Sequence, residues 1–163
     1  PGSTVESVVE VGLSYARPAV RKRIEEAIEV ARSSAKPLDI RAPLNRGYEG
    51  RTGTYPMSHA DENGCKAFAT FVAVGGDPRE AVVVAVNFGR DTDCAAASAA
   101  GLAGAFAGVA AVPREWIDGV EEGTRSNPYT NSHLTIEETA EGMHAALRSK
   151  LKRMGGYVKR MTS

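Results

Sequence analysis

The chain has 163 residues, and its 20 Lys and Arg residues balance 20 Asp and Glu residues, so its formal net charge is zero. A chain of this length can bury the core of one domain, and its neutrality argues against general attraction to nucleic acid or anionic membranes. Two cysteines make no disulfide framework, and no segment resembles a secretory signal. We therefore expect a cytoplasmic protein with free thiols.

Helical patterns fill the first part of the chain. Ser3 and Glu6 have the spacing of a capping box, and apolar residues then recur at helical intervals as far as Leu13. Pro18 suits the first turn of a second helix. The apolar stripe predicted for this second helix consists of Val20, Ile24, Ala27, Ile28 and Ala31.

Residues 34–60 contain too many Pro, Gly and Arg residues for a regular element, so we predict a long loop, and loops of this length in compact domains are often functional. Within this loop, Tyr55 offers an aromatic face and a hydroxyl group to a ligand, although it could equally serve as a loop anchor. Arg46 and Arg51 offer guanidinium groups that can grip phosphate oxygens. Simple exposure is the alternative for both arginines.

A third helix is predicted over residues 62–74, since its apolar residues recur at helical spacing. Ser58 or Asp61 would cap this helix, with Glu62 in its first turn. Alternatively, His59 and the two carboxylates could form a second metal site or an acid/base pair. Capping is the simpler interpretation.

A fourth helix is predicted from Asp77 to Asn87, where Asp, Pro and Glu open an apolar run. A longer run from Cys94 to Val112 carries no charge and is dominated by Ala and Gly. Its hydrophobicity is weak for a bilayer, so we predict a helix buried in a soluble bundle. Its glycines at 101, 104 and 108 would let neighbouring helices approach closely.

The segment between these two helices, NFGRDTDC over residues 87–94, places Asp91 and Asp93 in a glycine-containing turn directly before the Ala/Gly run. Carboxylates two residues apart can converge on one hard cation that takes oxygen ligands. The same residues could merely cap the helix, because Asp is a favoured N-cap residue. Spacing alone leaves both roles open.

The last helix has the clearest pattern in the chain. After a polar loop over residues 123–132, Thr135 and Glu138 form a capping box, and apolar residues repeat at intervals of three and four as far as Met154. We predict that the helix ends in a basic run before Gly155 and Gly156, as suits a helix carboxyl terminus. A phosphate-binding patch is the alternative role for the basic run.

The sequence GRDTDCAAASAAGLAGAFAG over residues 89–108, followed by Val112, Pro113 and Trp116, resembles the carboxy-terminal signature of the ADP-ribosylglycohydrolase family. The resemblance is close over residues 85–116 and looser, in the same order, elsewhere. It implies an all-α protein, a compact orthogonal helical bundle of the ADP-ribosylglycohydrolase type. It also implies a hydrolase that removes ADP-ribose from modified protein side chains, or from small ADP-ribosyl substrates, with two Mg²⁺ or Mn²⁺ ions.

Residue by residue, the resemblance implies that Asp91 and Asp93 are catalytic metal ligands. Cys94 stands where the family usually has a ligating Thr, and a thiol is a soft donor poorly matched to Mg²⁺. Cys94 is therefore either a third ligand or a small residue of the first helical turn. The resemblance also suggests that the loop over residues 34–60 lines the cleft and that Tyr55 and Arg90 bind the substrate.

The chain corresponds to the carboxy-terminal half of the family's length, and it contains no Thr-Asp-Asp cluster of the kind that supplies the family's other ligands. We therefore expect a single helical unit over residues 1–163 whose missing amino-terminal half comes from a second polypeptide. Two other functions stay open: a non-catalytic helical module, and a related hydrolase of another ribosyl N-glycoside.

Overall fold

The computed structural model describes residues 2–46, 48, 60–130 and 133–161. Every regular element in these residues is an α-helix or a 3₁₀ turn, which confirms the all-α class. The chain divides into two compact units, Pro1–Val112 and Pro113–Ser163. The reason is that the buried residues of the described part all lie in the first unit.

The first two helices form largely as predicted. Helix α1 spans Val5–Tyr15, but its cap is Thr4 rather than Ser3, because Thr4 and Ser7 exchange the two hydrogen bonds of a capping box. Helix α2 spans Pro18–Ser33, with Pro18 in its first turn. Four of the five predicted apolar positions of α2 are buried, and only Val20 is exposed.

The segment predicted as a loop over 34–60 is partly helical. A 3₁₀ turn, η1, covers Pro37–Ile40, and helix α3 covers Arg41–Arg46. Pro37 tolerates the first position of such a turn because its missing N–H would have no partner there. Ile40 is fully buried and Tyr48 is nearly so. Apolar contacts therefore anchor this segment, although its content of Pro and Arg predicted a loop.

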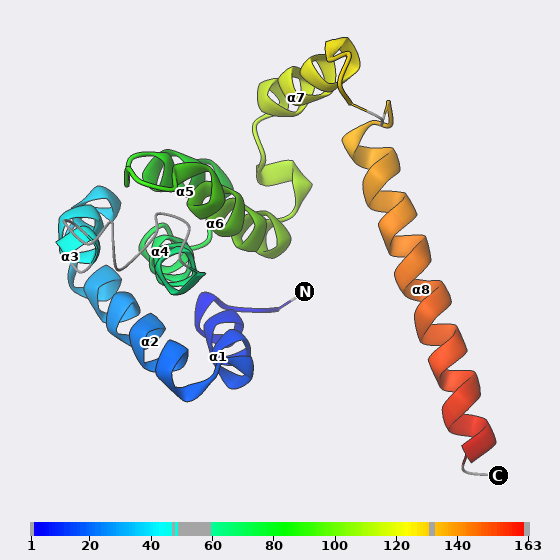
Figure 1. Cartoon of the computed structure of the whole chain (residues 1–163), viewed down its shortest axis with the longest axis horizontal. Helices are drawn as coiled ribbons and strands as arrows, with labels where there is room; N and C mark the ends of the chain where they lie inside the picture. Colours follow the sequence, from blue (N-terminus) through cyan, green and yellow to red (C-terminus); the bar gives the residue numbers. More distant parts are fainter. Residues whose placement is uncertain (1, 47, 49–59, 131–132, 162–163) are drawn as a thin grey trace. The chain divides into compact units, whose positions relative to one another are not determined.

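Helix α4, Ala60–Ala73, is the centre of the first unit (Figure 1). It packs against α2 on one side and against α6, Thr92–Ala107, on another, while α5, Pro78–Val86, packs on α6. Helix α1 also approaches α4 closely, since a Cβ on Gly12 would lie 2.6 Å from the ring of Phe68. Asp77 caps α5 by accepting a hydrogen bond from the Glu80 amide, as predicted.

The Ala/Gly helix is shorter than predicted. Helix α6 ends at Ala107 because Gly108 adopts a positive φ of 82°, a conformation in which glycine commonly stops a helix. A 3₁₀ turn, η2, follows over Val109–Ala111. Gly101 and Gly104 face open space, so the prediction of close packing at the glycines is wrong. The contact surface is instead made by Ala95, Ala96, Ala99 and Ala103, which are buried.

The second unit consists of two helices. Helix α7 spans Arg114–Ser126, so the segment from Gly123 to Ser126, predicted as loop, is helical. Helix α8 spans Ile136–Met161 and starts at the predicted capping box, in which Thr135 and Glu138 bond each other's backbone amides. It runs through Gly155 and Gly156 rather than stopping before them. Glycine inside a helix costs only about 1 kcal/mol, so a glycine pair need not end one.

No helix within the described ranges combines the length and the apolar character needed to cross a membrane.

Candidate metal centre

Asp91, Asp93 and Cys94 lie together at the amino-terminal end of α6. One potential ligand atom from each residue lies within 4.8 Å of the others. Asp91 is half-buried, whereas Asp93 and Cys94 are exposed, so the group is open to solvent. Within the described residues, Asp91, Asp93 and Cys94 form the one group of three His, Cys, Asp or Glu residues whose ligand atoms lie this close together. The helix terminus behind it adds a positive partial charge that favours anionic groups here.

Asp91 occupies the N-cap position of α6, but its side chain makes no capping hydrogen bond. Its carboxylate instead accepts a hydrogen bond of 2.9 Å from Nδ2 of Asn63 on α4. The hydrogen bond from Asn63 lowers the pKa of Asp91, and the hydrogen bond from the Cys94 thiol lowers it further. The backbone N–H of Cys94 also lowers the pKa of Asp91, more weakly, but it does not meet the geometric criteria of a capping hydrogen bond. A carboxylate has two oxygens with about four acceptor sites, so Asp91 can ligate a cation while it accepts the bond from Asn63.

Cys94 fits a hard cation less well than the two carboxylates do. The hydrogen bond to Asp91 raises the pKa of the Cys94 thiol, and desolvation raises it further. A thiol must lose its proton to ligate a metal, and a thiolate prefers softer ions than Mg²⁺. The donor set of this turn therefore fits Mg²⁺ or Mn²⁺ through Asp91 and Asp93.

Side chains from α3 and α4 hold the turn in place. Asn45 donates a hydrogen bond of 2.7 Å to the carbonyl of Phe88, whose ring is buried. Glu62 accepts two hydrogen bonds from the guanidinium of Arg90, at 2.8 and 3.0 Å. With the bond from Asn63 to Asp91, three contacts secure the residues at 88, 90 and 91. These contacts tie the turn at Asp91 to side chains of α3 and α4.

Arg90 has a positive φ of 63°, an uncommon conformation for a residue with a side chain. Such a conformation persists only when its surroundings enforce it. The paired hydrogen bonds to Glu62 do so here, because they fix the guanidinium on a fully buried carboxylate. The prediction that Arg90 binds substrate is not tested by this geometry, but the ion pair gives Arg90 a second role.

Glu62 lies in the first turn of the third helix, as predicted, whereas Asp61 lies inside that helix and is not its N-cap. Helix α4 begins before them, at Ala60, and both side chains are buried. Asp61 pairs with Arg23 of α2 at 2.7 Å, and Glu62 pairs with Lys66 at 2.6 Å as well as with Arg90. Buried charges need such partners, because desolvation is costly without them.

Sequence reasoning missed Asn45, Asn63 and Lys66. One readable signal existed: Glu62 and Lys66 are four residues apart, and they share a helix face with the buried Ala69. A charged pair on a buried face indicates an internal ion pair. Nothing local indicated Asn45, whose partner Phe88 lies 43 residues away.

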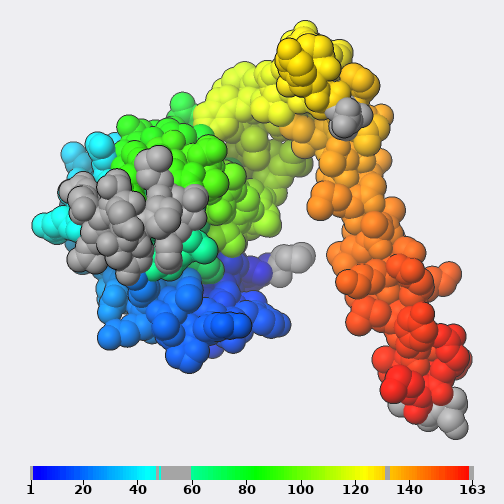
Figure 2. Space-filling view, viewed as in Figure 1, coloured from blue at the N-terminus to red at the C-terminus, as the bar shows by residue number. Residues whose placement is uncertain are grey.

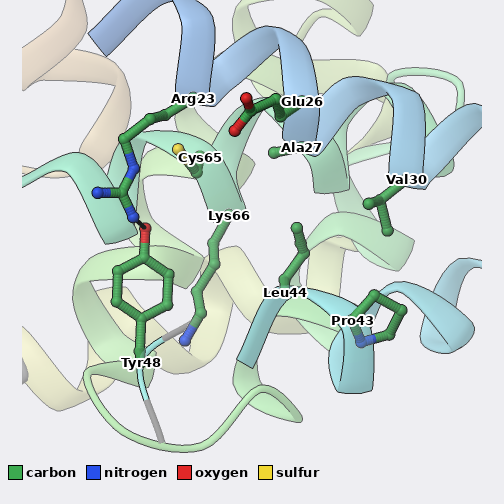
Figure 3. A pocket seen from close by; sticks show the side chains of 9 residues that line it. All are labelled: Arg23, Glu26, Ala27, Val30, Pro43, Leu44, Tyr48, Cys65 and Lys66. Carbon is green, nitrogen blue, oxygen red and sulfur yellow. Dashed lines mark hydrogen bonds between the residues drawn. The ribbon is translucent and has the colours of Figure 1, made fainter. Parts of the chain in front are cut away.

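A cavity of about 190 Å³ lies between α2, α3 and α4 (Figure 3). At its wall, Arg23 donates a hydrogen bond of 2.8 Å to the Tyr48 hydroxyl, and Lys66 is held by Glu62. Burial raises the pKa of the Cys65 thiol to about 11, so Cys65 is no nucleophile at neutral pH. Its wall also carries the Glu26 carboxylate, but within the described residues the close group of potential metal ligands is the one at Asp91.

Tyr55, Arg51, Ser58 and His59 lie outside the described residues, so their roles remain predictions. Arg46 is exposed at the end of α3.

Comparison with known families gives one assignment. A family model described as ADP-ribosylglycohydrolase matches residues 2–152. The match covers both the turn at Asp91 and the helices that hold it. Comparison with curated proteins gives no match, and comparison with solved structures gives none either.

Proposed function

The chain belongs to the ADP-ribosylglycohydrolase family, and we propose that it contributes one side of a metal-dependent site that removes ADP-ribose from modified side chains. Family membership supports a hydrolase of the glycosidase type. The observation that carries the metal proposal is the geometry of Asp91 and Asp93, which lie close together and open to solvent.

In this proposal, Asp91 and Asp93 hold Mg²⁺ or Mn²⁺. Two cations of six or more oxygen ligands each need more donors than this turn provides. We propose that a second acidic cluster, outside the residues of this sequence, supplies the remaining ligands. Bound ions of this kind polarise a sugar and orient its hydroxyl groups.

The reaction is hydrolysis of the ribosyl bond. The oxygen of a water molecule bonds to the anomeric carbon, the bond from that carbon to the side-chain atom breaks, and the leaving group takes a proton. Asp91 and Asp93 would hold the ions, and a base outside this turn would accept the proton of the water. Tyr55 and Arg90 are the proposed contacts to the rest of the substrate, Tyr55 through its aromatic face and Arg90 through phosphate oxygens.

The first test separates ligation from capping. Asn caps helices about as well as Asp, so Asp91→Asn should keep the free energy of unfolding if the residue only caps. If Asp91 and Asp93 hold the ion, Asp91→Asn and Asp93→Asn should each weaken Mn²⁺ binding by more than about tenfold. Mn²⁺ binding is measured by electron paramagnetic resonance of the free ion, and unfolding by urea titration.

Asp77→Asn is the matched control, since Asp77 is an N-cap residue whose side chain does accept a capping hydrogen bond. This variant should leave Mn²⁺ affinity unchanged. Unchanged affinity in both Asp91→Asn and Asp93→Asn would exclude the proposal and favour a non-catalytic helical module.

A further inference from the structure

Helix α8 carries an apolar stripe that nothing in its own unit covers. Met143 is 71% exposed, Leu147 is 53% exposed and Met154 is 51% exposed. Helix α7 does not bury them, because no residue of either helix is buried in the described part of this unit. Figure 2 shows α8, in orange and red, as a rod one helix wide. A stripe of this length on one helix indicates a partner surface.

The spacing of the stripe is that of a coiled coil. Seam positions separated by alternating steps of three and four residues run along the whole helix, as in a heptad repeat. They are occupied by Ile136, Ala140, Met143, Leu147, Lys150, Met154, Tyr157 and Met161. The single charged member, Lys150, has a long apolar stem that can lie along the seam while its amine reaches water.

The charges of α8 are divided between its ends. The acidic residues of the helix, Glu137, Glu138 and Glu141, occupy its first two turns. The basic residues follow in the second half: Arg148, Lys150, Lys152, Arg153, Lys159 and Arg160. Two such helices side by side repel each other if parallel and attract each other if antiparallel, because each acidic end then meets a basic end.

We propose that α8 is a self-association surface through which two copies of this chain pair in antiparallel orientation. In that orientation apolar seam residues meet each other except near the centre, where Leu147 lies level with Lys150 of the second copy. Ile136 lies level with Met161 of the second copy, and Met143 with Met154. Ala140 lies level with Tyr157, so a small residue faces a large one. The pairing is two-fold symmetric and therefore closes as a dimer.

The first measurement is sedimentation velocity of the whole chain over a concentration series. The mass should rise from one chain to two as concentration increases. Leu147→Lys places a second positive charge level with Lys150 of the other copy, so it should weaken dimerisation by at least about tenfold. Ser149→Lys, which makes the same charge change on the opposite face of α8, should leave it unchanged.

The second measurement tests orientation with spin labels on single cysteines, in a Cys94→Ser chain that keeps the buried Cys65. Along the length of α8, residue 149 lies level with the two-fold axis of the dimer, and residue 159 lies towards the carboxyl end of the helix. At a rise of about 1.5 Å per residue, labels at Lys159→Cys should lie farther apart than labels at Ser149→Cys by more than about 10 Å. Equal distances would indicate parallel helices and overturn the proposal, as would a monomer at every concentration or undiminished pairing of Leu147→Lys.

Discussion

Glu62 pairs with Arg90 in the turn that leads into Asp91, so the geometry of this turn depends on it. Its carboxylate is fully buried and is shared between Lys66 and the guanidinium of Arg90. Without that negative charge, two cations would remain in a low-dielectric interior with no counter-ion. The left-handed backbone of Arg90, which directs the chain into Asp91, would lose the contact that enforces it.

Glu62→Gln keeps the size of the side chain and removes its charge. We expect the free energy of unfolding to fall by about 3–5 kcal/mol, because breaking a buried ion pair leaves its partners uncompensated. Urea unfolding measures the change. Glu25→Gln is the control, since Glu25 forms an exposed pair with Arg21 on α2 and should cost less than about 1 kcal/mol. A similar small cost for both variants would contradict the role given to Glu62.

The sequence identifies the carboxylates of the turn but not the residues that hold them. Asp91 and Asp93 are neighbours in a short motif, so their convergence can be predicted from local spacing. Glu62 and Arg90 are 28 residues apart, and so are Asn63 and Asp91. Such pairings depend on how α4 packs beside the start of α6. No local pattern contains that information.

Among the helices, α6 packs through small side chains, and this sets how closely α4 and α5 can approach. Ala99 is fully buried at that contact, whereas Ala97 of the same helix is exposed. We expect Ala99→Leu to lower the free energy of unfolding by about 1–3 kcal/mol or more, since a well-packed core has no room for added methylenes.

Ala97→Leu makes the same substitution on the exposed side of α6 and should change stability by less than about 0.5 kcal/mol. Both variants are compared by urea unfolding at one temperature. Equal stability of the two would mean that the buried face of α6 is loosely packed, contrary to the structure.

Helix starts were predictable and helix ends were less so. The starts of α5 and α8 carry side-chain caps, at Asp77 and Thr135, that the sequence displays directly. The ends depend on backbone conformation at glycines. Gly108 takes a positive φ and stops α6, but Gly155 and Gly156 remain helical within α8. Glycine permits both outcomes, so its presence alone does not decide between them.

At the scale of the whole molecule, the hydrophobic core belongs to the first unit. The buried residues of the described chain lie before Val112, and the second unit buries none. A unit with its own core can fold alone. The turn at Asp91 and the residues that hold it, Asn45, Glu62 and Asn63, lie in this same unit.

We therefore expect residues 1–112, expressed alone, to unfold cooperatively in urea and to bind Mn²⁺ with the affinity of the whole chain. Circular dichroism follows the unfolding, and electron paramagnetic resonance measures the binding. The same fragment should remain monomeric at concentrations at which the whole chain forms dimers, because it lacks α8. A fragment that unfolds without a transition would show that the core needs the second unit. A folded fragment that still dimerises would place the self-association surface outside α8, while its Mn²⁺ affinity would report on the turn independently.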